Sequence, residues 1–410
     1  MVALVMNSYQ MAKVQRQHHQ TLGYLSMTQF NFPFVAASDE EVQLRKEVRS
    51  FLKAELASGG YQPTADCWMT AVSPEFSEKL GTQGWLGMTW PKKYGGHERT
   101  TLDRLIVTEE LLAAGAPVAA HWIADRQTGQ QIINFGSEEQ KTTILPKMVA
   151  GKSFAAIGMS EPQAGSDLAA VRTKAEKTKT GWRLNGRKIW STGAHHCDYM
   201  IVLARTSPAE GRNRQVGLSQ FLVPLKTPGV DVSGINDILN HVHFNETLFE
   251  DVDLAEDALL GKEGNGWAQC MGELALERSG PERFLSTFIL LEQALQTLRG
   301  KLDDQGLILL GQLIAKLTSL RIMSRGIALQ LAQGKAADTE AAMVKALGNI
   351  FEKEVVSVVR RLLSTIPESD WPETLSLMLD DAVLKLPANT LRGGTTEILR
   401  GIIARQLGAR

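Results

Sequence analysis

The sequence predicts an α+β protein in which a central β region lies between two helical regions. Three observations lead to this fold class. Apolar residues recur at helical spacing from Ser38 to Ala150, short runs rich in β-branched and aromatic residues fill Ser153 to Asp253, and the helical period returns after Gly266. The expected order along the chain is therefore helices, sheet, helices.

The first helical region is expected over residues 38–152. Ser38 and Glu41 form a capping-box pair, and apolar residues follow at helical spacing, namely Leu44, Val48, Phe51, Leu52 and Leu56. Glycines and aromatic residues at 84–87 and 90–96 interrupt the pattern, as a packed loop between helices would. We therefore expect an N-terminal helical domain in this part of the chain.

Residues 1–37, which precede this domain, are expected to form a leader or tail. As far as Asn31 they include Lys13 and Arg16 but no acidic residue, a composition that a transit peptide could share. A later methionine, Met27, favours instead an upstream start or a mobile tail.

The β region is expected over residues 153–262. Lys179-Thr180-Gly181 and Asn185-Gly186 are turn signals on either side of the short run Trp182 to Leu184. Further strands are expected at Tyr199–Ala204, Gln220–Leu225 and Thr247–Val252. These runs predict a β domain inserted between helical ones.

Residues 263–410 are expected to be helical again. Apolar residues recur at helical spacing at Leu307, Leu310, Ile314, Leu317 and Leu320, and the pattern persists to Gln406. The sequence has no internal repeat at a fixed period and no low-complexity tract. This region therefore predicts a C-terminal helical domain.

The composition excludes several classes of protein. The 410 residues are 43% hydrophobic, enough for a large core, and 44 basic against 45 acidic residues leave a net charge of -1. This balance gives no electrostatic reason to expect nucleic acid or an anionic membrane as partner. Cys67, Cys197 and Cys270 are far apart, so neither a disulfide framework nor a zinc knuckle is indicated. No apolar run approaches the roughly 18 residues of a membrane span, and we expect a cytoplasmic protein that binds a small or medium-sized ligand.

Four motifs carry a specific resemblance. Residues 157–167, IGMSEPQAGSD, resemble the flavin-binding signature of the acyl-CoA dehydrogenase family, and residues 186–192, GRKIWST, are similar to its second signature. Residues 136–141, GSEEQK, and 393–398, GGTTEI, match the family as well, in the same order along the chain. The resemblance implies an N-terminal helical domain, a central β-barrel-like domain and a C-terminal four-helix bundle.

The resemblance also implies FAD as the cofactor. A flavin ring has apolar faces and one polar edge, so its site needs hydroxyls and backbone amides at the edge and an apolar or aromatic wall at a face. By the resemblance, the ring contacts come from Ile157, Ser160, Ser166, Trp190, Ser191 and Thr192, with Thr395 and Glu397 as further cofactor contacts. Trp190 would supply the wall, and Ser166 would also face the pantetheine arm of the thioester.

Dehydrogenation at the α and β carbons needs a base for the α-proton and an acceptor for the β-hydrogen. Many family members carry a glutamate as base directly before the Gly-Thr of the C-terminal motif, where this chain has Gly393. The long-chain and isovaleryl-type branches place a glutamate on the first helix after the β domain instead, and residues 275–278, ALER, look like that helix. The resemblance thus implies Glu277 as base, with Glu273 and Glu282 as nearby rivals.

The charge that develops on the thioester carbonyl must be met by fixed donors. We expect the backbone amide of Gly393 to be one donor and a flavin ribityl hydroxyl to be the other, with Arg278 and Gly394 beside the substrate. The implied reaction converts an acyl-CoA to the 2-enoyl-CoA and passes the electrons to an electron-transfer flavoprotein.

Two segments depart from the family pattern. Where the family usually has Arg-x-x-Phe-Gly, which reaches across a dimer interface to FAD, residues 301–306 read KLDDQG, and a later Gly-Gly-x-Gly segment is replaced by residues 364–370, STIPESD. Both changes fall on the part of FAD that a partner subunit normally contacts. The expected assembly is a homo- or hetero-oligomer, dimer or tetramer, as in heterotetrameric family members that act on steroid side chains.

Two other functions stay open at this point. One is a flavin-dependent monooxygenase or oxidase of the same fold, which would activate oxygen, although the family-type Glu277 argues against it. The other is a partner subunit of a heteromeric dehydrogenase, which would explain the lost FAD contacts. His195-His196-Cys197 does not indicate a metal site, because adjacent strand residues point to opposite faces and no further ligand follows. The acyl group is open beyond a weak preference for branched or bulky chains, since Gly393 leaves room beside the reacting carbons.

Overall fold

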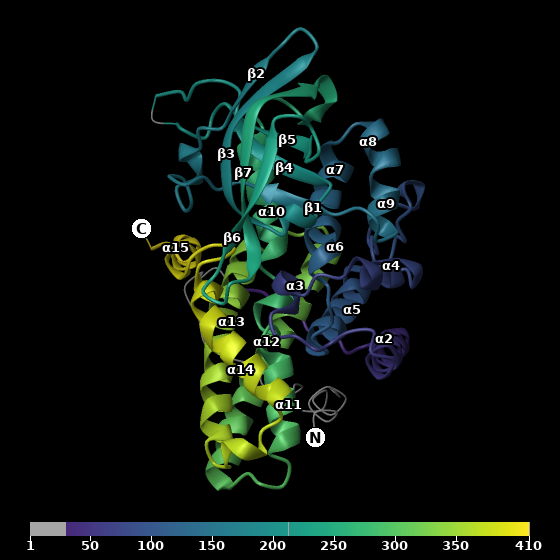
Figure 1. Ribbon diagram of the computed structural model, residues 1–410, viewed down its shortest axis with the longest axis vertical. Coiled ribbons are helices and arrows are strands. Elements are labelled where there is room, and N and C mark those ends of the chain that lie inside the picture. The colour runs from purple at the N-terminus through teal and green to yellow at the C-terminus, as the bar shows by residue number, and fades with distance from the viewer. Residues whose placement is uncertain (1–29, 212, 410) are drawn as a thin grey trace, which may run out of the picture. The chain divides into compact units, whose positions relative to one another are not determined.

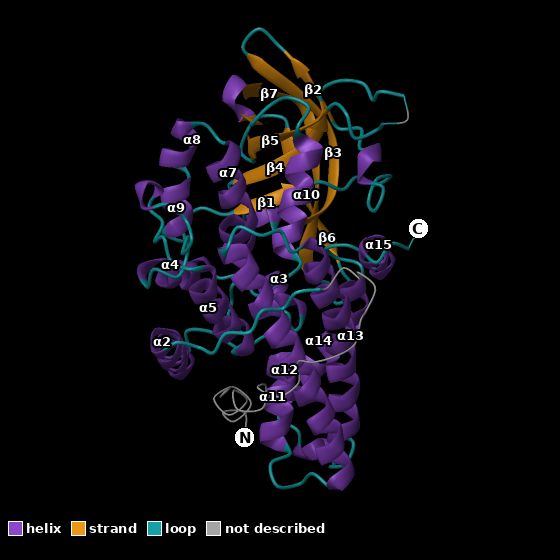
Figure 2. Cartoon of the chain, turned by 180° about the vertical axis from the view of Figure 1, so that it is seen from behind, coloured by secondary structure: helices purple, strands orange, loops and turns teal. Residues whose placement is uncertain are grey.

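The computed structural model describes residues 30–211 and 213–409, and only the backbone of residues 273–277. The expected leader or tail lies outside the described residues as far as residue 29. The chain divides into two compact units, of which unit 1 contains residues up to 66, 101–115 and 278–410, and unit 2 contains residues 67–100 and 116–277. Figure 1 follows the chain by colour, and Figure 2 shows the strands gathered together in unit 2.

Unit 1 is helical. Its α-helices are α2 Asp39–Ala57, α5 Thr101–Ala113, α11 Phe288–Thr297, α12 Asp304–Ala332, α13 Asp338–Leu363, α14 Glu373–Lys385 and α15 Thr396–Gln406. Short 3₁₀ helices follow at Pro281–Arg283, Glu368–Asp370 and Leu386–Thr390. The capping box predicted at Ser38 is confirmed, because its hydroxyl accepts from the Glu41 amide at 3.2 Å and the Glu41 carboxylate accepts from the Ser38 amide at 3.2 Å.

The long helices α12 and α13 run side by side in unit 1 (Figure 1). Of the apolar residues identified from the helical spacing, Leu310, Leu317 and Leu320 are buried in α12, whereas Ile314 is half-buried and Leu307 is exposed. By length and composition α12 could also cross a membrane, and it is the one such helix among the described residues. The apolar core helix of a bundle meets the same criteria.

Unit 2 contains shorter helices and all the strands that the structure describes. The helices are α3 Cys67–Thr70, α4 Pro74–Thr82, α6 Ala119–Ile123, α7 Gly129–Phe135, α8 Glu138–Thr143, α9 Leu145–Val149 and α10 Gly266–Glu277, with 3₁₀ helices at Lys92–Tyr94, Leu168–Ala170, Ala194–His196 and Glu256–Ala258 and a π-helical turn at Ala124–Thr128. The strands are β1 Ala155–Gly158, β2 Lys174–Lys177, β3 Gly181–Thr192, β4 Tyr199–Arg205, β5 Leu218–Pro224, β6 Val230–Asn236, β7 Val242–Ala255 and β8 Leu259–Leu260.

These strands form one mixed sheet in the order β6-β7-β3-β2-β4-β5-β8, with β1 added parallel to β4. Alternate residues point into an apolar core in which Trp182 of β3 meets Phe221 of β5 edge to face, with ring centroids 5.2 Å apart. The order expected from the sequence, helices then sheet then helices, is confirmed.

One turn prediction is wrong. Asn185-Gly186 does not end a strand but lies inside β3, which continues to Thr192. The pairing of β3 with β7 shifts register between Leu184 and Gly186, so the asparagine-glycine pair forms a bulge. Gly186 is required there, because its φ is +146° and a Cβ would lie 2.6 Å from Thr173 Cα.

Candidate active site

Two segments of unit 2, residues 157–167 and 186–192, are called the flavin segments below. The first begins on β1, whose Ile157 pairs with Ile201 of β4, and continues into a loop that contains Ser160 and the exposed Ser166. Gly158 lets this strand approach its neighbours closely, since a Cβ there would lie 2.7 Å from Met200 Sδ. The loop is thus held against the sheet at its start.

The two flavin segments are joined directly. The Ile189 amide donates to the Ser160 carbonyl at 3.0 Å, and the Lys188 ammonium donates to the Met159 carbonyl at 3.0 Å and to Glu161 Oε1 at 2.8 Å. Lys188 and Glu161 are both buried, with side chains 0% and 3% exposed. Backbone and side chain together therefore fix where one segment lies relative to the other.

The electrostatics of this buried pair favour its charged form. Burial opposes ionisation of Glu161, but Lys188 and the amides of Arg172 and Thr173, at 2.7 and 2.8 Å, outweigh it and lower the pKa of this carboxyl to about 2. Burial lowers the pKa of Lys188 to about 8, against the attraction of Glu161. The carboxylate is thus ionised near neutral pH, and its hydrogen bonds hold the loop.

Trp190 has the least ordinary backbone in the second segment. Its φ is +62°, in the left-handed region that L-residues rarely adopt, and β3 shifts register against β7 between Lys188 and Ser191. This bulge turns the indole outward, where it is 56% exposed in the chain and rests edge-on against Phe244 with centroids 5.8 Å apart. A large aromatic ring held at the surface by an unusual backbone is what a flat ligand needs as a wall.

The next two residues carry hydroxyls. Ser191 is fully buried, and its Oγ has no hydrogen-bond partner among the described residues, while its carbonyl accepts from Asn245 Nδ2 at 3.0 Å. Thr192 is half-buried at the end of β3. The serines, the threonine and the outward indole fit the polar edge and apolar face of a flavin ring.

Five further predicted site residues lie in unit 1, at or beside a turn formed by residues 393–395 that is called the glycine turn below, namely Arg278, Gly393, Gly394, Thr395 and Glu397. Gly393 and Gly394 have φ of +67° and +103°, which explains why glycine occupies both positions. A Cβ on Gly394 would lie 3.5 Å from a guanidinium nitrogen of Arg278, so the arginine rests against the turn. Thr395 ends the turn and caps α15, accepting from the Ile398 amide at 3.4 Å, and Glu397 is exposed in the first helical turn.

The Gly393 amide donates to no acceptor among the residues whose side chains are described. The residue is half-buried rather than fully exposed to water. A backbone N–H for which the described residues offer no acceptor, at a partly dehydrated turn, is a suitable donor for a carbonyl oxygen that gains charge.

The three glutamates proposed from the sequence differ in place. Glu277 is the last residue of α10, and Glu273 lies one turn earlier, but the side chains of both lie outside the described part. Glu282 lies in the 3₁₀ helix Pro281–Arg283 and is buried, with only 1% of its surface exposed. Glu282 is thus packed inside unit 1.

The segments that depart from the family pattern serve the fold. Asp303, within residues 301–306, is the N-cap of α12 and accepts from the Gly306 amide at 2.7 Å. Residues 364–370 end α13 and include the 3₁₀ helix Glu368–Asp370. Neither segment contains an arginine or the glycine-rich pattern that the resemblance led us to expect.

Histidines near Trp190 contact protein groups. His195 Nδ1 lies 2.8 Å from Asn245 Oδ1, and burial raises the pKa of the Cys197 thiol to about 12, so this thiol is not a ready metal ligand. Asp237, His241 and His243 place three possible ligand atoms within 4.8 Å of one another. Asp237 Oδ2 already lies 2.7 Å from His243 Nε2, while its Oδ1 accepts from the Leu239 and His241 amides, so protein groups engage both carboxylate oxygens.

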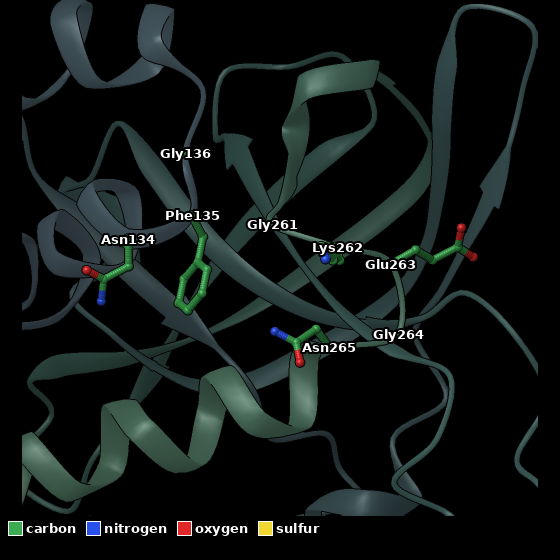
Figure 3. Close-up of a pocket in the computed structure, with 8 residues that line it drawn as sticks. All are labelled: Asn134, Phe135, Gly136, Gly261, Lys262, Glu263, Gly264 and Asn265. Carbon is green, nitrogen blue, oxygen red and sulfur yellow. The ribbon is translucent and has the colours of Figure 1, made fainter.

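A cavity of about 700 Å³ opens elsewhere in unit 2. Figure 3 shows its lining, which comes from the end of α7 and the loop that leads into α10, namely Asn134, Phe135, Gly136, Gly261, Lys262, Glu263, Gly264 and Asn265. None of the residues predicted for the site lines it. Its wall is rich in glycine and has one aromatic ring, that of Phe135, but it lacks the row of hydroxyls found beside Trp190.

Sequence reasoning missed two ion pairs that organise the site. Glu161 and Lys188 both lie inside the quoted motifs, so alternation along the strand could have indicated a buried lysine in need of a partner. Arg392, next to the glycine turn, pairs with Asp66 at 2.6 Å. Nothing in the sequence near Asp66 signals this contact.

Comparisons with known proteins agree with the motifs. Residues 38–152 match the family described as acyl-CoA dehydrogenase, N-terminal domain, and residues 156–252 match acyl-CoA dehydrogenase, middle domain. Acyl-CoA dehydrogenase IpdE1 of Mycobacterium tuberculosis (strain ATCC 25618 / H37Rv) is 32% identical over 346 residues, which cover 81% of this chain and 86% of that relative. The mitochondrial isovaleryl-CoA dehydrogenase of Pongo abelii is 35% identical over 244 residues, covering 59% of this chain and 57% of the relative.

Two solved structures are similar along most of the chain. The ChsE4-ChsE5 complex from Mycobacterium tuberculosis superposes with a TM-score of 0.76 at 25% identity, covering 92% of this chain and 100% of that one. The Tcur3481-Tcur3483 steroid ACAD shares the fold, with a TM-score of 0.81 at 24% identity, covering 92% and 99% of the two chains.

Proposed function

The chain belongs to the acyl-CoA dehydrogenase family of oxidoreductases, and from that premise we propose that it oxidises an acyl-CoA thioester to the 2-enoyl-CoA with FAD as cofactor. The observation that carries the proposal is the pair of interlocked flavin segments, from which a backbone bulge turns Trp190 outward. When bound, FAD supplies the acceptor for the β-hydrogen.

The flavin segments would hold the ring by its edge and one face. Ser160, Ser166 and Thr192 offer hydroxyls, Ile157 an apolar contact and Trp190 the wall. The buried Ser191 hydroxyl, which has no partner within the described part of the chain, is free to bond to the ring edge. In unit 1, Thr395 and Glu397 at the start of α15 are proposed as further cofactor contacts.

Glu277 is proposed as the base that removes the α-proton. It is the last residue of α10 and directly precedes Arg278, whose guanidinium rests against Gly394. Gly393 has no side chain and so vacates the alternative position for a base. The burial of Glu282 inside unit 1 supports Glu277 over this rival.

The Gly393 amide is proposed to donate to the thioester carbonyl while the α-carbon loses its proton. The donor is fixed before the reaction and therefore stabilises the developing negative charge without reorganisation. Arg278, Gly394 and Ser166 are proposed to line the path of the substrate, with Ser166 toward the pantetheine arm.

Assembly and partners follow from the missing contacts to the FAD tail. A non-identical homologue would supply the groups that residues 301–306 and 364–370 lack, and the likeness to a two-component complex and a steroid enzyme supports a hetero-oligomer that acts on a bulky acyl group. We further propose an electron-transfer flavoprotein as acceptor and the cytoplasm as location.

The divergence of residues 301–306 and 364–370 also supports a second candidate function, a partner subunit that does not itself turn over substrate. The segment that should reach FAD instead caps α12 through Asp303, so this chain gives the cofactor tail fewer contacts. A flavin-dependent monooxygenase or oxidase is less favoured, because the family-type Glu277 is retained.

The test is to purify the chain alone and with its nearest encoded homologue, and to titrate each under anaerobic conditions with a panel of acyl-CoA thioesters. We expect bound FAD with an oxidised-flavin spectrum that bleaches with one class of thioester. A protein that neither binds nor is stabilised by FAD in either form would exclude the proposal. A chain that stays colourless while the homologue carries flavin would favour the partner subunit.

A further inference from the structure

The glycine turn needs an anchor from outside itself. Gly393 and Gly394 have no side chains, and glycine explores a wide range of backbone angles, so the turn alone does not fix the direction of the Gly393 N–H. A donor that stabilises a reacting carbonyl must be fixed within a fraction of an ångström. The residues on either side of the turn are therefore the places to look for its support.

Arg392, the residue before the turn, makes a two-point contact with Asp66. Its guanidinium donates two hydrogen bonds to the Asp66 carboxylate, at 2.6 and 2.8 Å, and the two side chains are only 14% and 11% exposed. A two-point, charge-assisted pair of this kind fixes orientation as well as distance. We call this pair the Asp66–Arg392 clamp.

Asp66 is itself held rigidly. It adopts a left-handed φ of +58°, and its amide donates to the Ser286 carbonyl at 2.7 Å. The Ser286 amide donates to Glu352 Oε1 at 2.9 Å, and Glu352 Oε2 accepts from Asn389 Nδ2 at 3.0 Å. Because Asn389 lies three residues before Arg392, the network starts and ends on the segment that leads into the glycine turn.

This network is costly as a purely structural device. Glu352 and Asn389 are only 2% and 4% exposed, and burying polar side chains costs free energy that their hydrogen bonds largely offset rather than exceed. Buried polar networks of this kind do hold one arrangement in preference to others. Here the arrangement that is held is the backbone directly before Gly393.

We propose that Asp66 and Arg392 are positioning residues for the carbonyl donor, in that the clamp fixes the Gly393 N–H toward the thioester oxygen. The inference rests on the proposed function and adds the residues that make the glycine turn rigid. Neither side chain touches the substrate in this account. Both act through the backbone of Gly393.

The test compares wild type with Asp66→Asn and Arg392→Lys in the FAD-loaded assembly. Asparagine tolerates the left-handed φ but loses the charge, and lysine keeps the charge but loses the two-point geometry. Lys316→Gln is the matched control, because it breaks an exposed ion pair of unit 1, in which Lys316 lies 2.5 Å from Glu354 Oε1. The readouts are the infrared carbonyl band of a bound, ¹³C-labelled acyl-CoA, the rate of flavin reduction, and the acyl-CoA dissociation constant.

In wild type and the control, we expect the carbonyl band to lie below its position in free thioester. In both clamp variants it should move back toward the free value, and flavin reduction should slow by up to about 10²-fold with little change in binding. Folding of each variant is checked by thermal unfolding, and Arg392→Lys carries the test alone if Asp66→Asn does not fold. An unchanged band in a folded variant, or failure of both variants to fold, overturns the positioning role. A wild type that no acyl-CoA reduces instead overturns the proposed function, and the role of the clamp with it.

Discussion

In the flavin segments of unit 2, the ion pair that organises the site joins residues 27 positions apart, Glu161 and Lys188, and both lie within the motifs themselves. In the glycine turn of unit 1, the corresponding pair joins Asp66 to Arg392, 326 positions apart. A contact between neighbouring motifs can be predicted from the sequence pattern alone, whereas a contact between distant parts of the chain depends on the complete fold. This difference predicts different responses to substitution.

The largest expected effect is the loss of the buried pair in the flavin segments. Lys188→Met leaves the Glu161 carboxylate buried without its cation, which should cost about 3–5 kcal/mol in the free energy of unfolding. Urea unfolding measures it. The control is Arg183→Met, also on β3, which breaks an exposed ion pair between Arg183 and Asp253 of β7. It should cost less than about 1 kcal/mol in the free energy of unfolding.

The double variant Lys188→Met with Glu161→Gln separates charge from packing. Since it removes the unpaired charge, it should recover part of the stability lost in Lys188→Met. Equal instability of the single and double variants would mean that the pair matters only through its shape, and would remove the electrostatic half of the comparison.

A second effect, in unit 1, depends on pH. Burial raises the pKa of Glu352 to about 7 although Arg392 opposes the rise, whereas the unfolded chain has the ordinary value of 4.5. Between these values the folded state holds a proton that the unfolded state has lost, so stability from this group falls as pH rises from 4.5 to about 7 and is constant above. The difference corresponds to about 3 kcal/mol.

Glu352→Gln should abolish this part of the pH dependence. The variant should match wild type near pH 5 and exceed it at pH 8, as measured by urea unfolding at both values. If the free energy of unfolding depends on pH in the same way in both proteins, Glu352 has an ordinary pKa. Its carboxyl would then be ionised, not protonated, in the network behind the glycine turn.

The smallest effect on stability is expected at Trp190. The indole is 56% exposed and its backbone is left-handed, so Trp190→Gly should change the free energy of unfolding by no more than about 1 kcal/mol. The flavin spectrum and electron transfer to an electron-transfer flavoprotein should nevertheless change. Trp182→Ala, on the same strand but 2% exposed, should be strongly destabilising. Unchanged turnover in Trp190→Gly would assign this indole to surface packing.

Much of the fold could be predicted from the sequence because its signals are local. The capping box at Ser38, the leucine spacing of α12 and the strand at Tyr199–Ala204 each depend on residues close in the chain. The Asn185-Gly186 turn failed for the same reason, since β7 pairs across it and converts a local turn signal into a bulge.

The site divides in the same way. The hydroxyls, the indole and the two glycines proposed for the site come from motifs, because those residue types are tied to flavin and carbonyl chemistry. The left-handed backbone of Trp190 and the Asp66–Arg392 clamp could not be predicted from motifs, since a bulge depends on the partner strand and the clamp on a distant turn.

If this chain dehydrogenates an acyl-CoA with Glu277 as base, replacing Glu277 must slow flavin reduction, which anaerobic stopped-flow spectroscopy measures. Wild type, Glu277→Gln and the matched control Glu282→Gln are mixed with the acyl-CoA that bleaches the wild-type flavin. We expect Glu277→Gln to keep its flavin and bind the thioester but to be reduced at least about 10²-fold more slowly, while Glu282→Gln stays near wild type. Reduction of Glu277→Gln at the wild-type rate, with the loss appearing in Glu282→Gln, would contradict this expectation and assign the base to Glu282.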